Sequence, residues 1–468
     1  MTTPHQPTPA SPTAGAQAGD VIPFREALRA WFAISLQTFG GPAGQIAVMQ
    51  RTLVDEKRWI GQKRFLHALS YCTLLPGPEA QQLAIYIGWL LNGVRGGLVA
   101  GTLFVLPGVA ALLALSAVYV TAGDTLLVTA LFVGLAPAVL AIVAQAVVRV
   151  AGRALGHPAL VAVAVAAFVA LAAFAVPFPL VIAGAAAIGW ALGRWAPHTM
   201  HTATGHASGP DGPAPLIPDD TLHVEQPSRA HAVKVLAIGV TAWAVPVGAV
   251  AALTGAGSIF TDQALFFSGA ALVTFGGAYA VLAYVAQKAV EVYGWLAPGE
   301  MVHGLALAET TPGPLIMVVQ FVAFVGAYRQ PGALDPWAAA VLAALLTTWV
   351  TFVPCFVFVF VGAPWVERLR GNHALSSALA GITAAVVGVI ANLALFFALH
   401  TLFGSTTSLN WGPAHLEVPD LGTLRPVALG IGVAAAVLLF RLKWPVLRTL
   451  GVCAALGVAA GLVAAAAG

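Results

Sequence analysis

The chain has 468 residues, of which 59% are hydrophobic and only 8% are charged. Soluble domains carry about 25% charged residues, so the composition excludes a water-soluble globular protein. The formal net charge is +3, and no basic run is interleaved with aromatic residues, so nothing in the sequence points to nucleic acid as a partner.

Residues 1–24 are rich in Pro, Thr, Ala and Gln and lack a basic stretch followed by a short apolar core. We expect a disordered N-terminal tail here and not a cleavable signal peptide. Apolar segments long enough to cross a bilayer as helices follow this tail. They lie near residues 27–50, 65–92, 97–120, 125–148, 159–176 and 178–196, and, after a polar stretch, near 231–253, 262–288, 300–328, 337–362, 375–400, 426–442 and 445–467. The pattern predicts an all-α polytopic membrane protein.

The sequence repeats itself internally, and two motifs recur with the same offset of 236 residues (275 − 39 and 312 − 76). They are Thr38-Phe39-Gly40-Gly41, which recurs as Thr274-Phe275-Gly276-Gly277, and Pro76-Gly77-Pro78, which recurs as Pro312-Gly313-Pro314. Beyond an insertion the register returns at 247, where Pro107 matches Pro354 and Gly134 matches Gly381 (354 − 107 and 381 − 134). The repeat predicts two homologous halves, 25–196 and 255–468, joined by a polar cytoplasmic linker at 197–230 and a linking transmembrane helix at 231–254.

The linking helix sets the relative orientation of the halves. Because it adds one crossing, the second half starts on the opposite side of the membrane from the first, which predicts the inverted repeat found in many secondary transporters. Cytoplasmic loops are enriched in Lys and Arg, and this rule places the N-terminus in the cytoplasm. The inside loops then hold Arg95, Arg149, Arg153, Arg194, Arg229, Lys234, Lys288, Arg368, Arg370, Arg441, Lys443 and Arg448.

One basic loop, at residues 51–64, does not fit this count if every segment spans the membrane. It falls inside if segments 27–50 and 65–92, which are interrupted by Gly and Pro, each enter the membrane and return to the same side. The inverted relation survives in that arrangement, and Lys288 moves outside. We favour broken or re-entrant helices, and the sequence leaves open whether these two segments span or re-enter.

The two Pro-Gly-Pro motifs, Pro76-Gly77-Pro78 and Pro312-Gly313-Pro314, interrupt apolar segments. Proline lacks an N–H and clashes with the preceding turn, so each motif predicts a break and a new half-helix. The first N–H groups of a helix are free and its dipole is positive there. Two opposed half-helix N-termini near the membrane midplane would form an anion site without a buried Lys or Arg. The alternative is a plain proline kink.

Glu79 and Glu309 are the acidic residues that lie well inside apolar segments, each within three residues of a Pro-Gly-Pro motif. An ionisable residue at that depth is costly and is by default a functional candidate, so we expect both to couple transport to proton binding. The alternative is a neutral glutamic acid that caps a helix or bonds a neighbour. His67 and His303 occupy equivalent positions in the repeat and are candidates for a proton relay, with anchoring of a polar ring at the membrane interface as the alternative.

The Phe-Gly-Gly motifs supply further candidates for anion binding, because glycine exposes backbone to a ligand. Small-residue helix packing is the alternative reason for these glycines. The candidate substrate-binding residues, including the nearby amide and hydroxyl donors, are Gly40, Gly41, Pro42, Gly44, Gln45, Pro76, Gly77, Pro78, Gln81, Gln82, Gly276, Gly277, Thr310, Thr311, Pro312, Gly313 and Pro314.

No residue pattern in the chain indicates a metal, a cofactor or an enzymatic reaction. The three cysteines, Cys72, Cys355 and Cys453, are scattered in or beside apolar segments and are expected to be packing residues. The linker histidines have no tight spacing, so a solvated connector is the expected structure. A lipid-modifying membrane enzyme would need a cluster of metal ligands or a nucleophile, and a reductase would need a cofactor motif or paired cysteines.

These motifs resemble the bacterial chromate ion transporter family in its long-chain, two-domain form. In the first half the resemblance rests on Phe39-Gly40-Gly41-Pro42, Gly44-Gln45, Leu75-Pro76-Gly77-Pro78-Glu79-Ala80-Gln81-Gln82, Gly96-Gly97 and Phe104-Val105-Leu106-Pro107-Gly108. In the second half it rests on Thr274-Phe275-Gly276-Gly277-Ala278-Tyr279 and Ala308-Glu309-Thr310-Thr311-Pro312-Gly313-Pro314-Leu315.

The resemblance implies export of chromate across the bacterial inner membrane, which confers chromate resistance, with sulfate as a close analogue and the proton or potential gradient as the energy source. The residues by themselves support only a small-anion site between two broken helices with protonatable neighbours. Export of an oxyanion by alternating access is the leading hypothesis. The expected partners are a tetrahedral oxyanion, a coupling proton or other ion, and the lipid bilayer. A passive anion channel, a transporter of sulfate or another oxyanion, and a homodimeric state remain open alternatives.

Overall fold

We describe the fold from a computed structural model, in which the described residues are 21–196, 216–217, 228–275, 277–363, 372–412 and 414–467. Gly276, most of the predicted tail and nearly all of the predicted linker, including four of its histidines, lie outside the described residues.

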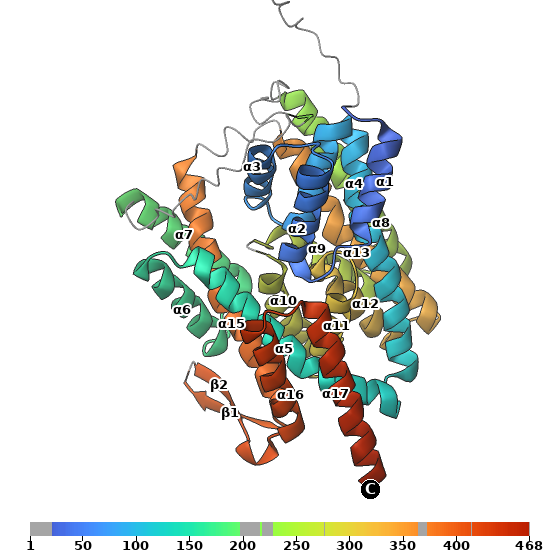
Figure 1. The fold of residues 1–468 in the computed structure, drawn as a ribbon, viewed down its shortest axis with the longest axis vertical. Coiled ribbons are helices and arrows are strands. Elements are labelled where there is room, and N and C mark those ends of the chain that lie inside the picture. Colours follow the sequence, from blue (N-terminus) through green and yellow to red (C-terminus); the bar gives the residue numbers. More distant parts are fainter. Residues whose placement is uncertain are drawn as a thin grey trace, which may run out of the picture.

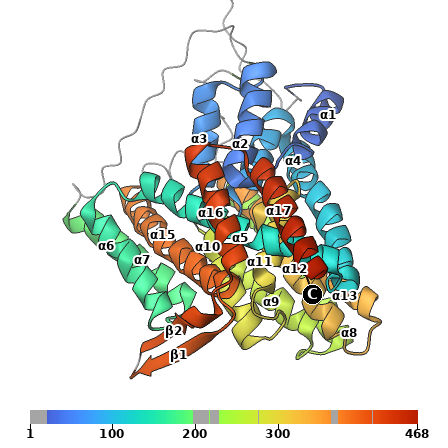
Figure 2. The same ribbon diagram turned by 60° about the horizontal axis from the view of Figure 1, so that its bottom comes forward.

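Helices make up most of the described chain (Figure 1 and Figure 2). In the first half they are α1 (Phe24–Ser35), α2 (Gly41–Gln50), η1 (Arg51–Glu56), α3 (Gln62–Cys72), α4 (Glu79–Ala122), α5 (Leu126–Ala154), α6 (Pro158–Ala172) and α7 (Phe178–Trp195). The linking helix is α8 (Arg229–Thr254). In the second half the elements are α9 (Ile259–Leu272), α10 (Ala278–Gln287), η3 (Lys288–Val292), α11 (Glu300–Thr310), η4 (Leu315–Met317), α12 (Val318–Arg329), α13 (Pro336–Gly362), α15 (His373–Leu402), β1 (Thr406–Trp411), β2 (Ala414–Pro419), η6 (Leu421–Thr423), α16 (Pro426–Ala436), η7 (Val437–Arg441) and α17 (Val446–Ala467).

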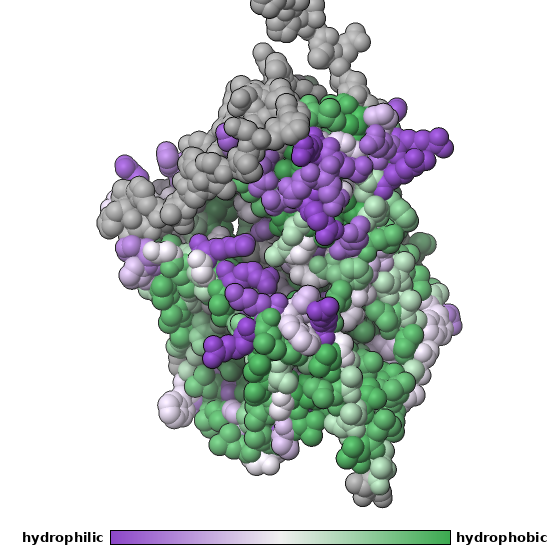
Figure 3. Space-filling model, viewed as in Figure 1, coloured by the Kyte–Doolittle hydropathy of each residue, from purple (hydrophilic) through white to green (hydrophobic). Residues whose placement is uncertain are grey.

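Seven helices in the described part of the chain are long and apolar enough to cross a membrane. They are α4, α5, α7, α8, α13, α15 and α17. Hydrophobic residues cover the lower part of the surface in Figure 3, and hydrophilic residues gather at the top, over α1 to α3. The predicted all-α, multi-pass membrane architecture is confirmed.

Four of the predicted segments are broken where the repeated motifs lie. Segment 27–50 forms α1 and α2, and segment 65–92 forms α3 and the start of α4. Segment 262–288 forms α9 and α10, and segment 300–328 forms α11 and α12 with the short η4 between them. The helices α1, α2, α3 and α9 to α12 have 10 to 14 residues, hence lengths of about 15–21 Å against a hydrocarbon core of about 30 Å. None of these seven helices spans a bilayer alone.

Contacts across the first half show that its broken segments return to the end of the molecule where they start. Lys57 follows η1, and its ammonium lies 3.8 Å from a carboxylate oxygen of Glu26, near the start of α1. The Asn92 side chain donates to the Ile22 carbonyl at 2.7 Å, so the first part of α4 also ends beside the start of α1. Both segments therefore re-enter, and the basic loop lies at the same end as the start of α1.

The second half opens toward the opposite end. Past a sharp corner at Asn92 and Gly93, α4 runs to Tyr119, whose hydroxyl donates to Glu300 at the start of α11. The 27 residues from 92 to 119 (119 − 92) span about 40 Å as a helix. Glu300 in turn pairs with Arg329 at the end of α12, so α11 and α12 form a hairpin that returns to this second end. The two halves are inverted with respect to each other, as the sequence predicts.

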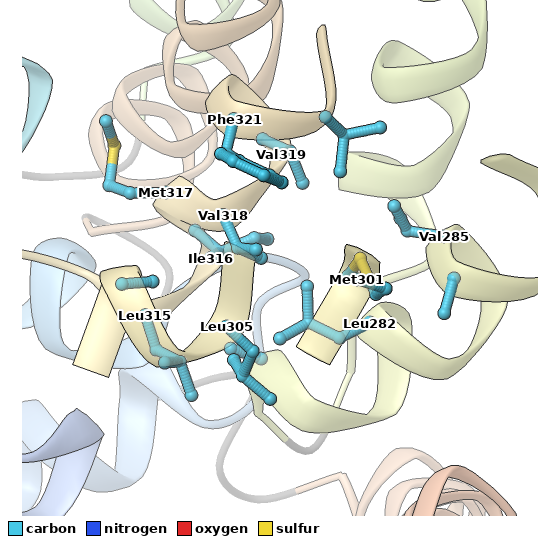
Figure 4. Close-up of a cluster of buried hydrophobic side chains, with 14 of the residues drawn as sticks. Leu282, Val285, Met301, Leu305, Leu315, Ile316, Met317, Val318, Val319 and Phe321 are labelled. Atoms are coloured by element: carbon cyan, nitrogen blue, oxygen red, sulfur yellow. The ribbon is translucent and has the colours of Figure 1, made fainter. Parts of the chain in front are cut away.

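Apolar side chains hold the broken helices of the second half together. Figure 4 shows Leu282 of α10, Met301 and Leu305 of α11, and residues of η4 and α12 gathered in one buried cluster. Met301 and Leu305 are fully buried. Because α10, α11 and η4 each contribute side chains to the same cluster, none of the breaks beside them is free to move independently.

A two-stranded antiparallel hairpin, β1–β2, is an addition that the hydrophobic pattern does not predict. It joins α15 to α16, pairs Thr406 with Pro419 and Trp411 with Ala414, and is exposed over most of its length. It lies at the bottom of Figure 1, where the chain also ends. Its short strands contribute nothing to the apolar periodicity that identifies membrane helices, which is why the segment reads as a loop.

Glycine at the centre of the first Pro-Gly-Pro break provides a stability test. Gly77 has φ +121°, which a residue with a Cβ rarely adopts, and an added Cβ would lie 2.9 Å from Cys355 Sγ and 2.9 Å from Gln82 Nε2. We predict that Gly77→Ala destabilises the fold by about 1–3 kcal/mol, the usual cost of one strained backbone residue. Thermal unfolding of purified protein in detergent measures the effect.

Gly184→Ala is the matched control, because Gly184 lies within helix α7, and no atom lies within 4 Å of its added Cβ. We expect this variant to unfold at the wild-type temperature or above it, since alanine is the better helix former. An unfolding temperature for Gly77→Ala equal to that of Gly184→Ala would contradict the description of this break.

Candidate functional site

The four breaks are joined by an exchange of backbone hydrogen bonds. The Gly77 N–H donates to the Thr274 carbonyl at 2.7 Å, and the Gly313 N–H donates to the Thr38 carbonyl at 3.0 Å. Both the donors and the acceptors are equivalent in the repeat (313 − 77 and 274 − 38 are both 236). Reciprocal contacts of this kind are the mark of a two-fold relation, here an approximate one between the halves. Each Phe-Gly-Gly break thus supports the Pro-Gly-Pro break of the other half.

A second pair of contacts repeats this symmetry behind the breaks. Gly77 packs against Cys355 of α13, and Gly313 packs against Gly108 of α4. Gly108 and Cys355 are also equivalent in the repeat, at its second offset (355 − 108 = 247). The long helices α4 and α13 therefore form the two walls against which the Pro-Gly-Pro breaks rest.

Four helix N-termini begin at these breaks, and none is capped by a side chain. The N-cap residues are Gly40 for α2, Pro78 for α4, Gly277 for α10 and Pro314 for η4. In α4 the first helical hydrogen bond is donated by the Gln82 N–H to the Pro78 carbonyl at 3.1 Å. The preceding N–H groups of the first turn have no carbonyl within the helix to which they can donate. Uncapped N–H groups and a positive helix dipole together suit an anion.

The glycines at two of these N-termini border open space. Gly40 has φ +79° and Gly277 has φ +104°, and a Cβ added at either one would meet no atom within 4 Å. Both residues are partly exposed. A Cβ added at Gly41 would lie 3.9 Å from the Tyr279 hydroxyl, so the breaks of α2 and α10 face each other across this space. A small ligand can therefore reach backbone here.

One of the two predicted carboxylates, that of Glu309, is buried in this region. Glu309 is 2% exposed, and one of its oxygens accepts a hydrogen bond of 2.5 Å from the Tyr279 hydroxyl. Its other oxygen has no hydrogen-bond partner. Glu79 is partly exposed in the first turn of α4. Tyr279 lies two residues beyond the repeated Thr-Phe-Gly-Gly motif, and sequence reasoning did not assign it to the site, because its contact with Glu309 is made across a break.

The three predicted glutamines have different surroundings. Gln45 donates its side-chain N–H to the Gly313 carbonyl at 2.6 Å, and Gln82 donates to the Pro76 carbonyl at 2.7 Å. These two amides therefore tie down the Pro-Gly-Pro breaks. Gln81 is fully buried, and neither its oxygen nor its nitrogen has a partner. Of the three, Gln81 is the one whose amide N–H groups are free to bind a ligand.

The two predicted threonines lie at the C-terminal end of α11. Thr310 donates its hydroxyl to the Leu307 carbonyl at 2.8 Å, and Thr311 donates to the Ala308 carbonyl at 3.0 Å. With their hydrogens engaged in their own helix, both hydroxyls are left as acceptors. In this conformation they shape the break and do not donate to an anion.

Two arginines from α5 approach the site, and sequence reasoning placed them only in a cytoplasmic loop. Arg149 lies within electrostatic range of Glu309 and Tyr279, and Arg153 lies within range of Glu79. Both arginines are exposed, and Arg149 is also hydrogen-bonded to Gln145 at 3.0 Å. Their spacing of four residues places them on one helix face, which is the signal in the sequence that could have grouped them.

The two predicted histidines lie on α11 and α3, each on a different broken segment. His303 lies near the start of α11, where its ring stacks on Phe132 with centroids 4.2 Å apart and its Nδ1 lies 3.3 Å from the Tyr119 hydroxyl. His67 lies partly buried on α3. A proton relay through either histidine remains a prediction.

Metal-ligating groups do not gather at this site. Among the described residues, no three His, Cys, Asp or Glu side chains lie close enough to hold a metal ion. Cys72, Cys355 and Cys453 are buried free thiols. At this site Gly40 and Gly277 border open space, and the buried amide of Gln81 has no hydrogen-bond partner.

Known proteins resemble this chain over most of its length. The chromate transporter family matches residues 25–190 and 261–459. A chromate transport protein of Pseudomonas aeruginosa is 31% identical over 76% of this chain and 76% of its own. A probable chromate transport protein of Synechococcus elongatus and a chromate transport protein of Cupriavidus metallidurans are each 25% identical, over 85% and 88% of this chain and 90% of their own. No solved structure shows significant similarity. The chain is a multi-pass membrane protein that belongs to the chromate transporter family.

Proposed function

We propose that the protein exports chromate across the bacterial inner membrane by alternating access, recognises sulfate as well, and thereby confers chromate resistance. The observation that carries the proposal is the set of four uncapped helix N-termini held together by the exchanged bonds of Gly77 and Gly313. The chromate transporter family match supports chromate as the substrate.

The anion binds at the breaks through backbone groups and Gln81. A tetrahedral dianion presents four acceptor oxygens, which complement the free N–H groups of the first turns of α2, α4 and α10. Gln81 supplies the amide N–H groups that have no protein partner. No Lys or Arg needs to be desolvated at the site. Arg149 and Arg153 are exposed, and they lie within electrostatic range of Glu309 and Glu79. Long-range attraction by exposed arginines concentrates the anion without binding it too tightly to leave.

Glu309 couples transport to protons. A carboxylate this deeply buried with a single donor, the Tyr279 hydroxyl, is costly to keep ionised. An ionised Glu309 repels a dianion at the neighbouring breaks, and a protonated one does not. Proton binding at Glu309, and at Glu79 beside the α4 N-terminus, therefore governs when the anion occupies the site.

The two halves, 25–196 and 255–468, move against each other around the breaks. Inverted halves allow two related conformations, one open to each side of the membrane. The linker at 197–230 and α8 join the halves without belonging to either. Helix α5 is placed to follow this motion, since Arg149 and Arg153 lie at the mouth of the site and Thr129, near the other end of the helix, lines a cavity at the opposite end of the molecule.

Replacement of Glu309 by Gln tests the coupling. We predict that Glu309→Gln lowers chromate accumulation driven by a pH gradient at least tenfold in everted membrane vesicles, while flux down the chromate gradient persists. The amide keeps the shape and the bond to Tyr279 but binds no proton. Chromate uptake is measured with and without an imposed pH gradient.

Glu417→Gln is the matched control, since Glu417 lies on the exposed hairpin strand β2. We expect its uptake to equal that of the wild type. Gradient-driven accumulation by Glu309→Gln at the wild-type level would rule out Glu309 as the coupling carboxylate. Wild-type flux that follows only the electrochemical gradient of the anion would identify a passive channel.

Replacement of Arg149 by Gln tests the approach to the site. We predict that Arg149→Gln raises the KM for chromate up to about fivefold, because an exposed charge pair contributes about 0.2–1 kcal/mol, and leaves the maximal rate unchanged. The increase should shrink at high salt, where the charge is screened. Initial uptake rates in everted vesicles at low and high ionic strength measure both effects.

Arg95→Gln serves as the control, because Arg95 is exposed beside the corner of α4. Its expected KM is that of the wild type. Equal KM values for the Arg149 and Arg95 variants at low salt would show that Arg149 plays no part in recruiting the anion.

A further inference from the structure

A large cavity lies at the end of the molecule opposite Arg149 and Arg153. Its volume is about 960 Å³. Its polar lining includes Tyr119, Asp124, Glu300, His303, Arg329 and Arg425. With the N-terminus in the cytoplasm, as the positive charges predict, this cavity opens to the outside. None of these residues belongs to the proposed anion-binding site, and only His303 among them is a candidate for the proton relay.

Four hydrogen bonds from three residues converge on a single carboxylate in this cavity. Arg329 donates two parallel hydrogen bonds to the oxygens of Glu300, at 2.6 and 2.7 Å. The Tyr119 hydroxyl donates to Glu300 at 2.8 Å, and the Ala297 N–H donates at 2.7 Å. The Glu300 side chain is 11% exposed and that of Arg329 is 46% exposed, so the guanidinium is reachable from the cavity.

The donors around Glu300 match the needs of an oxyanion. A guanidinium fork binds two oxygens of a phosphate-like anion as well as it binds two carboxylate oxygens. The Tyr119 hydroxyl and the Ala297 N–H add one donor to each oxygen of the pair. The carboxylate of Glu300 is thus an internal anion that occupies a set of donors suited to an external oxyanion.

The other charges that face the donors around Glu300 come from several elements. Asp124 lies in the loop between α4 and α5, His303 lies on α11, His400 lies on α15, and Arg425 precedes α16. Arg425 donates to the His400 carbonyl at 3.5 Å. Counting formal charges with neutral histidines, Arg329 and Arg425 balance Glu300 and Asp124. A proton on Glu300 leaves the cavity with a net positive charge.

We propose that Arg329, Tyr119 and the Ala297 N–H form a second oxyanion site in this outer cavity, which we call the vestibule. Glu300 occupies the site when it is ionised and leaves it when it binds a proton. The ligand class is a tetrahedral dianion such as sulfate or chromate. This inference rests on the proposed function, because it makes the vestibule the place where the transported anion leaves. Each proton bound by Glu300 neutralises the competing carboxylate and frees Arg329 for the dianion.

Helix α11 links this vestibule to the transport site. Glu300 is its first residue and Glu309 its tenth, so nine residue steps of a helix, about 14 Å, separate the two carboxylates. Release of Glu300 from Arg329 removes the ion pair that fastens the start of α11 to the end of α12. The proton that releases Glu300 from Arg329 therefore also weakens the attachment of α11, the helix that carries Glu309, to α12.

Binding stoichiometry tests the proposal. Full-length protein in lipid nanodiscs is titrated with radiolabelled sulfate at neutral pH. We expect the wild type to bind one equivalent and Glu300→Gln to bind two, because the amide competes poorly for the guanidinium. The double variant Glu300→Gln, Arg329→Gln should return to one equivalent, and it buries no unpaired charge. Glu291→Gln, at the same end but lining a different cavity, is the control and should bind one equivalent.

A second measurement does not depend on any variant folding. The wild type titrated at falling pH should gain the second equivalent as Glu300 binds its proton, whereas Glu300→Gln should already bind this equivalent at neutral pH. One equivalent in Glu300→Gln, or no gain in the wild type as the pH falls, overturns the vestibule site while wild-type sulfate binding and chromate transport leave the proposed function standing. Absence of oxyanion binding and transport in the wild type overturns both.

Discussion

Backbone that is not helical inside a membrane must find its hydrogen bonds within the protein, and this constraint shapes the whole molecule. Each half of the chain breaks two helices, and the breaks satisfy one another across the two-fold relation through the Gly77–Thr274 and Gly313–Thr38 bonds. Neither half can make these bonds alone. The interior therefore exists only when both halves are present and inverted, which explains why the linking helix α8 lies between them.

The same breaks give the protein its chemistry. A broken helix starts again with free N–H groups, and four such starts at the junction of the halves create a positive region without a positive side chain. Glycine is needed there for conformation and for access, as at Gly40 and Gly277, where a Cβ would project into the open space. Glu309 and Tyr279 then place a titratable group beside this region. In the proposed function, the architecture itself brings an anion and a proton to neighbouring positions.

Much of this could be predicted from the sequence, because the repeated motifs are local. The Pro-Gly-Pro and Phe-Gly-Gly offsets locate the breaks, and the linking helix implies the inversion. The partners of each side chain could not be predicted, because they come from distant parts of the chain. Gln45 and Gln82 were expected to face a ligand, yet their amides donate to backbone carbonyls of the breaks. The approach of Arg149 to Glu309, and the bonds of Arg329 and Tyr119 to Glu300, depend on tertiary packing that no periodicity encodes.

The backbone of the two halves is nearly symmetric, but the charges at equivalent positions are not. At the offset of 236, Glu79 corresponds to Leu315 and Glu309 to Thr73, so each half carries its carboxylate on a different side of its break. At the start of the equivalent helices α3 and α11, Arg64 corresponds to Glu300, which reverses the charge between the two ends of the molecule. A symmetric scaffold by itself would make its two access states equivalent. Charges that differ between equivalent positions make the two states unequal in their affinity for anions and protons.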